Sequence, residues 1–134
     1  MFSGKFFLTV FLITVAITFI QWFFIGFLFH KYQASTPTTW RKENTRSYAA
    51  SMLISLFFAF MFTIIFFIWE SNADSSMNIV DGIIFGAVFW LAFSVTAEIG
   101  NAIYVNYSRM FVVGKCLSSL VEYIVAGILA VTLL

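Results

Sequence analysis

The sequence predicts an all-α integral membrane protein, a four-helix bundle, and three observations lead to this fold class. Of the 134 residues, 62% are hydrophobic and only 10% are charged, whereas a soluble domain usually carries about 25% charged residues. Apolar stretches of roughly 20 residues, the length that a transmembrane helix needs, account for nearly the whole chain. The strict polar–apolar alternation of a transmembrane β-strand is absent. We therefore expect a single transmembrane domain over residues 1–134.

The predicted spans cover residues of about 6–29, 48–69, 82–104 and 110–133. The first apolar run is about 24 residues long, which exceeds the roughly 7–15 apolar residues of a signal peptide. It also ends in bulky residues rather than in the small residues of a cleavage site. We therefore interpret it as a retained span.

The connection between the first two spans, residues 30–47, is polar and mostly basic. Pro37 follows Thr36, and proline suits the first turn of a helix that a preceding Ser or Thr caps. We expect a short interfacial helix here, with Trp40 at the level of the lipid headgroups, which continues into the second span or stops before it. The loop's charged residues are Lys31, Arg41, Lys42, Glu43 and Arg46.

The distribution of Lys and Arg predicts the orientation in the membrane. The first loop holds four basic residues and the second, Glu70 to Val80, holds none, and short cytoplasmic loops are enriched in Lys and Arg. The first and third loops are therefore predicted to be cytoplasmic, with both termini outside. The corresponding localisation is the inner membrane of a bacterium. Asp81 is the predicted N-cap of the third span.

Small and polar residues recur on single faces of the first three spans. In the first span, Thr14, Thr18 and Gln21 share a face and are interpreted as hydrogen-bonding to neighbouring helices. In the second span a small residue recurs every four positions, and the third span opens with Gly82 and Gly86. Such patterns permit close helix approach in membranes, so they predict surfaces for self-association.

The last two spans contain polar groups that a hydrocarbon interior would normally exclude. Glu98 follows Ser94 and precedes Asn101 on one face of the third span, and Glu122 shares a face with Lys115 in the fourth. Folding this hairpin about the turn at 106–109 brings the two faces together, with Lys115 a candidate partner of Glu98 and Glu122 one layer deeper. The predicted polar cluster consists of Gln21, Ser94, Glu98, Asn101, Lys115, Ser118, Ser119 and Glu122.

An ionisable residue inside a membrane span is costly and is a functional-site hypothesis by default. Three hypotheses stay open for this cluster. The groups pair to fix the helix register, with one glutamate protonated, or a glutamate cycles a proton or binds a cation as a small transporter or channel requires. In the third hypothesis the polar face recruits another membrane protein or a lipid headgroup.

The sequence favours a structural or accessory membrane subunit over an enzyme. It has no metalloprotease motif, no carboxylate pair on a loop and no plausible nucleophile–base set. His30 is the only histidine and Cys116 the only cysteine, so we expect no metal site, no cofactor and no disulfide within the chain. The expected partners are the lipid bilayer and either a second copy or other membrane proteins, and not nucleic acid, because the few basic residues cluster beside helix ends.

Several short elements resemble a family of small bacterial membrane proteins catalogued as the domain-of-unknown-function 1761 family. They are Trp90-Leu91-Ala92-Phe93, the later Asn101, and the closing Ala126-Gly127-Ile128-Leu129. Members of that family carry a Trp-Leu-Gly-Phe-like element, so an alanine here replaces the usual glycine, and Asn106-Tyr107-Ser108-Arg109 replaces an acidic-Gly-Arg-Pro turn. The resemblance implies a four-helix membrane fold and no particular activity.

Overall fold

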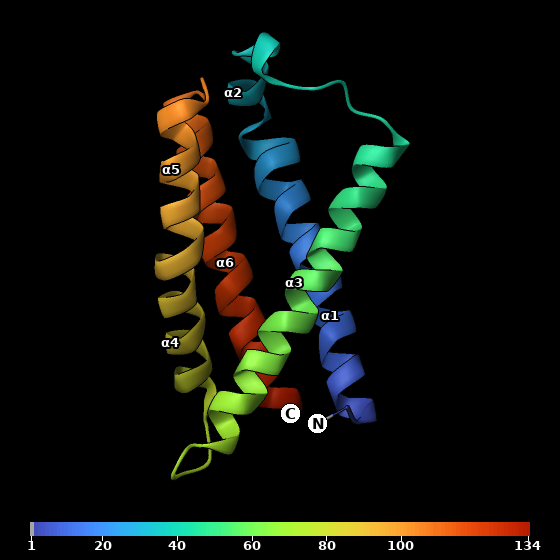
Figure 1. The fold of residues 1–134 in the computed structure, drawn as a ribbon, viewed down its shortest axis with the longest axis vertical. Coiled ribbons are helices and arrows are strands. Elements are labelled where there is room, and N and C mark those ends of the chain that lie inside the picture. Colours follow the sequence, from blue (N-terminus) through green and yellow to red (C-terminus); the bar gives the residue numbers. More distant parts are fainter. Residues whose placement is uncertain (1) are drawn as a thin grey trace.

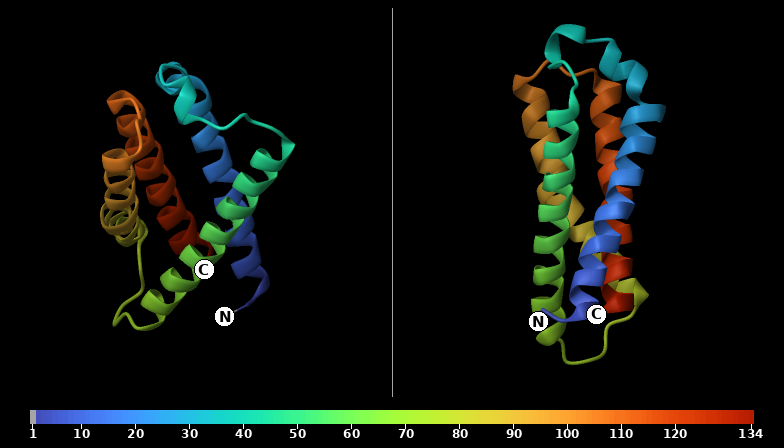
Figure 2. Two further views of the ribbon diagram at one scale, coloured as in Figure 1. Left: turned by 45° about the horizontal axis from the view of Figure 1, so that its top comes forward. Right: turned by 90° about the vertical axis from the view of Figure 1, so that its right-hand side faces the viewer.

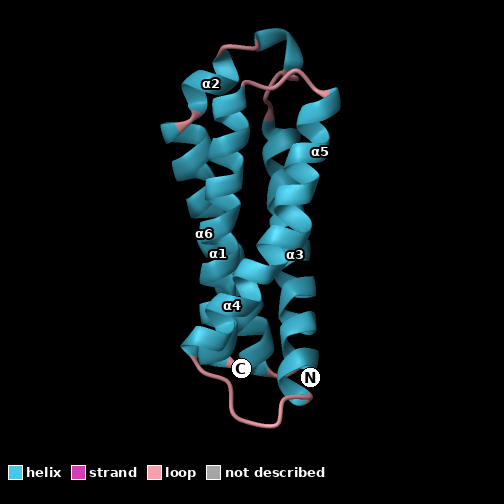
Figure 3. Cartoon of the chain, turned by 90° about the vertical axis from the view of Figure 1, so that its left-hand side faces the viewer, coloured by secondary structure: helices cyan, strands magenta, loops and turns pink. Residues whose placement is uncertain are grey.

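The computed structural model describes residues 2–134 and confirms the predicted fold class (Figure 1). Over those residues the regular elements are all helical, with no strand (Figure 3). Four helical segments are long and apolar enough to cross a membrane: Gly4–Leu28, Thr45–Ser71, Ile79–Tyr104 and Arg109–Leu133. The chain is therefore a multi-pass membrane protein.

Two of the four segments change helix type along their length. The first consists of α1 (Gly4–Gln21) and the π-helix η1 (Trp22–Leu28). The third consists of α4 (Ile79–Phe89), the π-helix η3 (Trp90–Val95) and α5 (Thr96–Tyr104). The second and fourth are the single helices α3 (Thr45–Ser71) and α6 (Arg109–Leu133).

The closest helix pair is α4 against α6, and glycine makes it possible. A Cβ atom on Gly82 or Gly86 would collide with the backbone of α6 at Gly127 or Tyr123. Without those side chains the two helices approach until their backbones touch, which is the packing that small residues allow in membranes. The glycine pattern of the third span thus serves packing within the chain.

The remaining core lies where α1 packs between α3 and α6. Phe6, Ile13 and Ile17 of α1 are almost completely buried, as are Phe66 and Ala126 of the neighbouring helices. The small residues of α3 from position 55 to 63 face this interior, since Ser55, Ala59 and Thr63 are buried. These small-residue surfaces are therefore covered within one chain and give no support to self-association, which stays a prediction.

The bundle is tight at one end and open at the other. Both termini lie at the end where α4 meets α6, and the loops after η1 and α5 lie at the opposite end (Figure 1). There α3 begins far from α5 and α6, and along its length it approaches α6 and α4 (Figure 2). Residues 41–54 are accordingly all exposed.

Asparagine residues, rather than the residues predicted from sequence, begin two of the helices. The sequence predicts Asp81 as the cap of the third span, but Asn78 is the N-cap. Oδ2 of Asp81, at the third helical position, accepts a hydrogen bond of 2.8 Å from the backbone N–H of Asn78. Asn44 and Ser47 form the same reciprocal box at the start of α3. A capping box satisfies two backbone N–H donors at once, which explains why each helix starts at asparagine.

The first loop contains two short helical pieces instead of one interfacial helix. They are α2 (His30–Ala34) and a single 3₁₀ turn, η2 (Pro37–Thr39). Pro37 does stand in the first turn of η2, but Thr36 gives no side-chain cap, and Trp40 is already extended with φ −100° and ψ 137°. Neither piece continues into α3, which has its own cap at Asn44.

Candidate functional site

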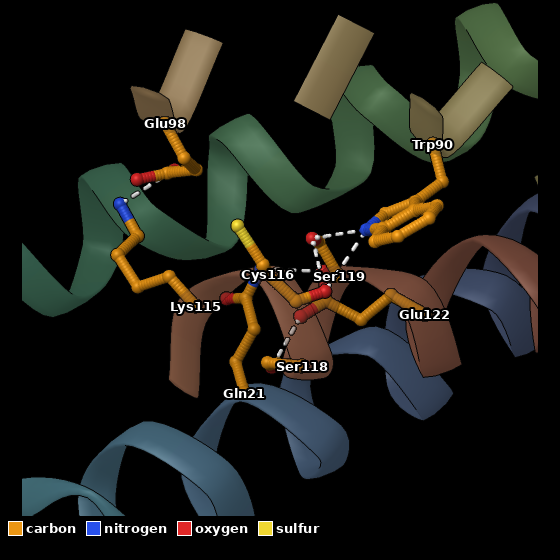
Figure 4. A network of polar contacts seen from close by, with 8 residues as sticks. All are labelled: Gln21, Trp90, Glu98, Lys115, Cys116, Ser118, Ser119 and Glu122. Atoms are coloured by element: carbon orange, nitrogen blue, oxygen red, sulfur yellow. Dashed lines mark hydrogen bonds and ion pairs between the residues drawn. The ribbon is translucent and has the colours of Figure 1, made fainter. Parts of the chain in front are cut away.

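The most buried acidic side chain among the described residues is that of Glu122, which is 7% exposed. Its Oε2 atom accepts a hydrogen bond of 3.1 Å from Nε2 of Gln21 on α1. Its Oε1 atom accepts one of 2.7 Å from Oγ of Ser118, one turn earlier on α6 (Figure 4). Both carboxyl oxygens are thus bonded, and one of the bonds joins the first transmembrane segment to the last.

A second carboxyl group, that of Glu98, is paired with Lys115 across α5 and α6. The distance from Nζ of Lys115 to Oε1 of Glu98 is 2.8 Å, and the two side chains are 34% and 15% exposed. The other oxygen of Glu98, Oε2, is buried and has no hydrogen-bond partner among the described residues. Glu98 therefore keeps an acceptor that a proton, a cation or a water molecule can use.

Trp90 contacts the stretch of α6 between Lys115 and Glu122 and was not predicted as part of the cluster. Its Nε1–H donates to the backbone oxygen of Cys116 at 2.9 Å and to Oγ of Ser119 at 3.2 Å. A buried indole N–H usually finds a partner. A tryptophan in the middle of a span with a polar face could therefore have indicated that Trp90 belongs to the cluster. Trp90 thus adds Ser119 and the backbone carbonyl group of Cys116, both on α6, to the polar contacts of the cluster (Figure 4).

The two π-helices border this cluster. Gln21 is the last residue of α1 and η1 begins at the next residue, while η3 begins at Trp90 itself. In a π-helix the hydrogen bonds run between residues five apart, and such segments occur frequently at functional sites. The backbone therefore changes from α-helix to π-helix at or next to Gln21 and Trp90, the two residues that donate side-chain hydrogen bonds to α6.

Two residues of the predicted cluster stay outside the network. Asn101 is exposed on α5, near the open end of the bundle, and Ser94 is only half-buried in η3. Thr14 and Thr18 do not reach neighbouring helices either, because their hydroxyl groups donate to the carbonyl oxygens of Val10 and Thr14 on their own helix. Only Gln21 of that stripe makes the interhelical bond that was predicted for all three.

The cluster's chemistry is that of proton and cation acceptors held in an apolar surrounding. Over residues 2–134, no three His, Cys, Asp or Glu side chains lie close enough to hold a metal ion together. The groups that meet are two carboxyl groups, one ammonium group, hydroxyl groups and an amide (Figure 4). They can fasten helices to one another, or exchange a proton or a monovalent cation.

Comparison with protein-family models gives one family for this chain. A family model described as "Protein of unknown function (DUF1761)" matches residues 8–131. The chain belongs to this family. The match begins in α1 and ends near the C-terminus of α6, so it includes every residue of the polar cluster. No curated protein and no solved structure matches the chain, and the description of this family assigns no activity.

Proposed function

We propose that this member of the family is a structural or accessory subunit of the bacterial inner membrane, without catalytic activity. The observation that supports this most directly is the state of Glu122, whose two oxygens are both bonded by side chains of its own chain. A polar group that is satisfied in this way fixes the register of the helices that supply its partners.

The open flank of the bundle supports a role as an interaction subunit. Leu53 and Phe57 on α3 are each 67% exposed. Farther along α3, an apolar groove of about 180 Å³ lies between α3, the α4–η3 junction and α6 and is lined by Phe58, Met61, Phe62, Ile65, Phe89, Phe93 and Tyr123. A second copy or another membrane protein would cover this flank.

We further propose that the loop end of the bundle faces the cytoplasm. This end holds α2, the loop before α3 and the starts of α3 and α6 (Figure 1), and with them Lys31, Arg41, Lys42, Arg46 and Arg109. Lys5 is in the first turn of α1, at the other end. This asymmetry follows the positive-inside rule. In a Cys116→Ala background, an impermeant maleimide added to intact cells should label Ser75→Cys and spare Thr38→Cys; the reverse pattern contradicts the proposed orientation.

Replacements of Glu122 test the structural role. Glutamine at position 122 can still accept from Gln21 and bond to Ser118, so the free energy of unfolding should change by less than about 1 kcal/mol. Alanine removes both bonds and leaves the Gln21 amide in an apolar interior, so it should cost about 2 kcal/mol. The control is Glu70→Gln at the end of α3, outside the cluster, and unfolding is followed by circular dichroism in mixed micelles.

Proton flux in reconstituted vesicles, read with an internal pH dye, separates this proposal from transport. A structural subunit gives the same low flux for wild type, Glu122→Gln and Glu70→Gln. Proton-coupled flux in wild type that disappears in a fully folded Glu122→Gln variant would overturn the structural proposal.

The second candidate function is a small proton- or cation-coupled transporter or channel, and the unbonded Oε2 atom of Glu98 favours it. An intramembrane carboxylate with a free acceptor is suited to bind and release a proton or a cation. In this case Glu98→Gln abolishes the flux while Lys115 remains in place. If Glu98→Gln vesicles conduct as wild-type vesicles do, Glu98 has no such role.

Photocrosslinking tests the accessory role directly. A photoreactive amino acid at Leu53 or Phe57 on the open flank should crosslink to one defined membrane protein or to a second copy. The matched position is Phe11 on α1, which is 61% exposed on another helix and should crosslink only to lipid. Lipid adducts alone at all three positions would contradict a partner on the open flank.

A further inference from the structure

A hollow with a volume of about 580 Å³ opens at the loop end of the bundle. It lies between the first loop, the first turn of α3 and the turn that joins α5 to α6. Its lining residues are Gln33, Thr39, Trp40, Arg41, Lys42, Glu43, Asn44, Arg46, Ser47 and Tyr107. None of them belongs to the polar cluster around Glu122, so this is a separate feature of the molecule.

The wall of the hollow is fastened to α6 by aromatic contacts. The ring of Trp40 lies 4.8 Å from that of Phe111, which is buried, and 5.3 Å from that of Tyr107. Oγ1 of Thr39 donates a hydrogen bond of 3.0 Å to the backbone oxygen of Asn106. The loop is thus held against the opposite turn, and the hollow is a built feature rather than a chance opening between loose segments.

Three cations line this hollow and have no carboxylate partner. The only ion pair among the described residues joins Lys115 to Glu98, so Arg41, Lys42 and Arg46 have no acidic side chain at ion-pair distance. Glu43 is the one acid in the lining, and its Oε2 atom accepts a hydrogen bond of 2.6 Å from the hydroxyl group of Tyr48 on α3. The cationic groups therefore remain available to an external anion.

Neutral donors stand beside these cations. In the capping box at the start of α3, Asn44 accepts hydrogen bonds through Oδ1, and its side-chain amide nitrogen takes no part. Gln33, which also has a side-chain amide, lines the same hollow. Arginine guanidinium groups bind phosphate through two parallel N–H donors, and lysine adds a point charge. Basic pockets beside transmembrane helices bind the phosphates of anionic lipid headgroups.

We propose that this hollow is a binding site for a phosphate group, carried either by an anionic lipid headgroup or by a soluble phosphate compound. Arg41 and Arg46 hold the phosphate oxygens from the two ends of the loop segment 41–46, and Lys42 adds the third charge between them. Trp40 lines the hollow as well, and an amphipathic ring of this kind suits the membrane interface. The volume of the hollow leaves room for the group to which the phosphate is attached.

Binding to the purified full-length protein in a neutral detergent tests this site. The probes are inorganic phosphate, short-chain phosphatidylglycerol and, as the lipid without phosphate, short-chain diacylglycerol, each titrated by calorimetry. We expect one or both phosphate probes to bind in competition with salt, and diacylglycerol not to bind. Tighter binding of phosphatidylglycerol assigns the site to lipid, and tighter binding of inorganic phosphate assigns it to a soluble compound.

Two triple variants that remove the same charge distinguish a site from general electrostatic attraction. The variant Arg41→Gln, Lys42→Gln and Arg46→Gln should weaken phosphate binding by more than about tenfold. The matched variant Lys5→Gln, Lys31→Gln and Arg109→Gln leaves the hollow intact and should change the dissociation constant by less than about twofold. Equal weakening in both variants, or no binding of either phosphate probe to the wild type, would overturn the proposal.

Single replacements keep the test decisive if the first triple variant unfolds. Lys42→Gln alone should weaken binding by about threefold, because it removes one exposed charge. Glu43→Gln should act in the opposite direction and tighten binding by about twofold, because it removes the only negative charge of the lining. A Glu43→Gln protein that binds phosphate less well than wild type would contradict the proposed geometry.

Discussion

The third transmembrane segment contacts α6 in two different ways along its length. In its first half, α4 lies backbone to backbone on α6 because Gly82 and Gly86 carry no side chains. In its second half, α5 touches α6 far less, and the main link is the ion pair of Glu98 with Lys115. The π-helix η3 separates the two halves, and Trp90 at its start holds α6 through two hydrogen bonds.

The difference shows how packing and polar contacts divide the task of holding two helices together. Contacts recur every four residues on both helices, from Gly82 with Gly127 to Gly86 with Tyr123 and then Trp90 with Ser119. Backbone contact fixes the distance where glycine allows it, whereas a long charged pair bridges a wider separation. We therefore expect the contact of α6 with Gly82 and Gly86 to contribute more to stability than the contact made in the polar half of the segment, through the Glu98–Lys115 ion pair.

The largest expected effect comes from filling the glycine contact. Gly86→Ala places a methyl group where the carbonyl group of Tyr123 now lies, so α4 and α6 must move apart. Overpacking of this kind typically costs 1–3 kcal/mol, and we expect about 3 kcal/mol here because the obstructing group is backbone. The free energy of unfolding in mixed micelles measures the effect.

Gly100→Ala in α5 is the matched control for this substitution. Nothing lies within 4 Å of a Cβ atom at position 100, and alanine is a better helix former than glycine by about 1 kcal/mol. The same chemical change should therefore stabilise the protein slightly in the polar half. A similar loss at both positions would contradict the division between the two halves.

The sequence was sufficient for the fold class, because it depends on the length of apolar runs and little else. It also made Lys115 a candidate partner of Glu98, since folding the hairpin about the turn at 106–109 aligns their faces, but it left open whether Lys115 points to the headgroups instead. The structure shows the pair. The glycine pattern indicated close packing, but spacing alone does not tell whether the partner is another helix of the chain or a second copy. The structure shows α6 as the partner.

Other parts of the site depend on geometry that the sequence does not contain. A regular helix was assumed for the third span, whereas η3 changes the helical phase between Ser94 and Glu98, and Asn101 ends on the exposed side of α5. The bond from Gln21 to Glu122 joins residues 101 positions apart, and only the packing of α1 on α6 brings them together. The splay of α3, which makes the open flank, has no signal in the apolar pattern.

The next largest effect is expected at the ion pair. Lys115→Met removes the partner of Glu98 and leaves its carboxylate unpaired in a mostly apolar setting. We expect the free energy of unfolding to fall by about 2 kcal/mol, which is less than for a fully buried pair because this pair is partly exposed. The double variant Lys115→Met, Glu98→Gln removes both charges and should lose less than about 1 kcal/mol. A double-mutant cycle measures this coupling, and strictly additive losses would show that the two charges do not interact.

The smallest effect is expected for Trp90→Phe, although this substitution breaks two hydrogen bonds. The carbonyl group of Cys116 also accepts a bond from Oγ of Ser119, so losing the indole N–H leaves neither group without a partner. A hydrogen bond whose loss strands no buried group is worth about 1 kcal/mol or less. Trp22→Phe, at a position that is 63% exposed, is the control and should have no measurable effect. If Trp90→Phe costs more than Lys115→Met, the indole rather than the ion pair would be the main link across the polar half, and η3 would belong with the tightly packed half of the segment.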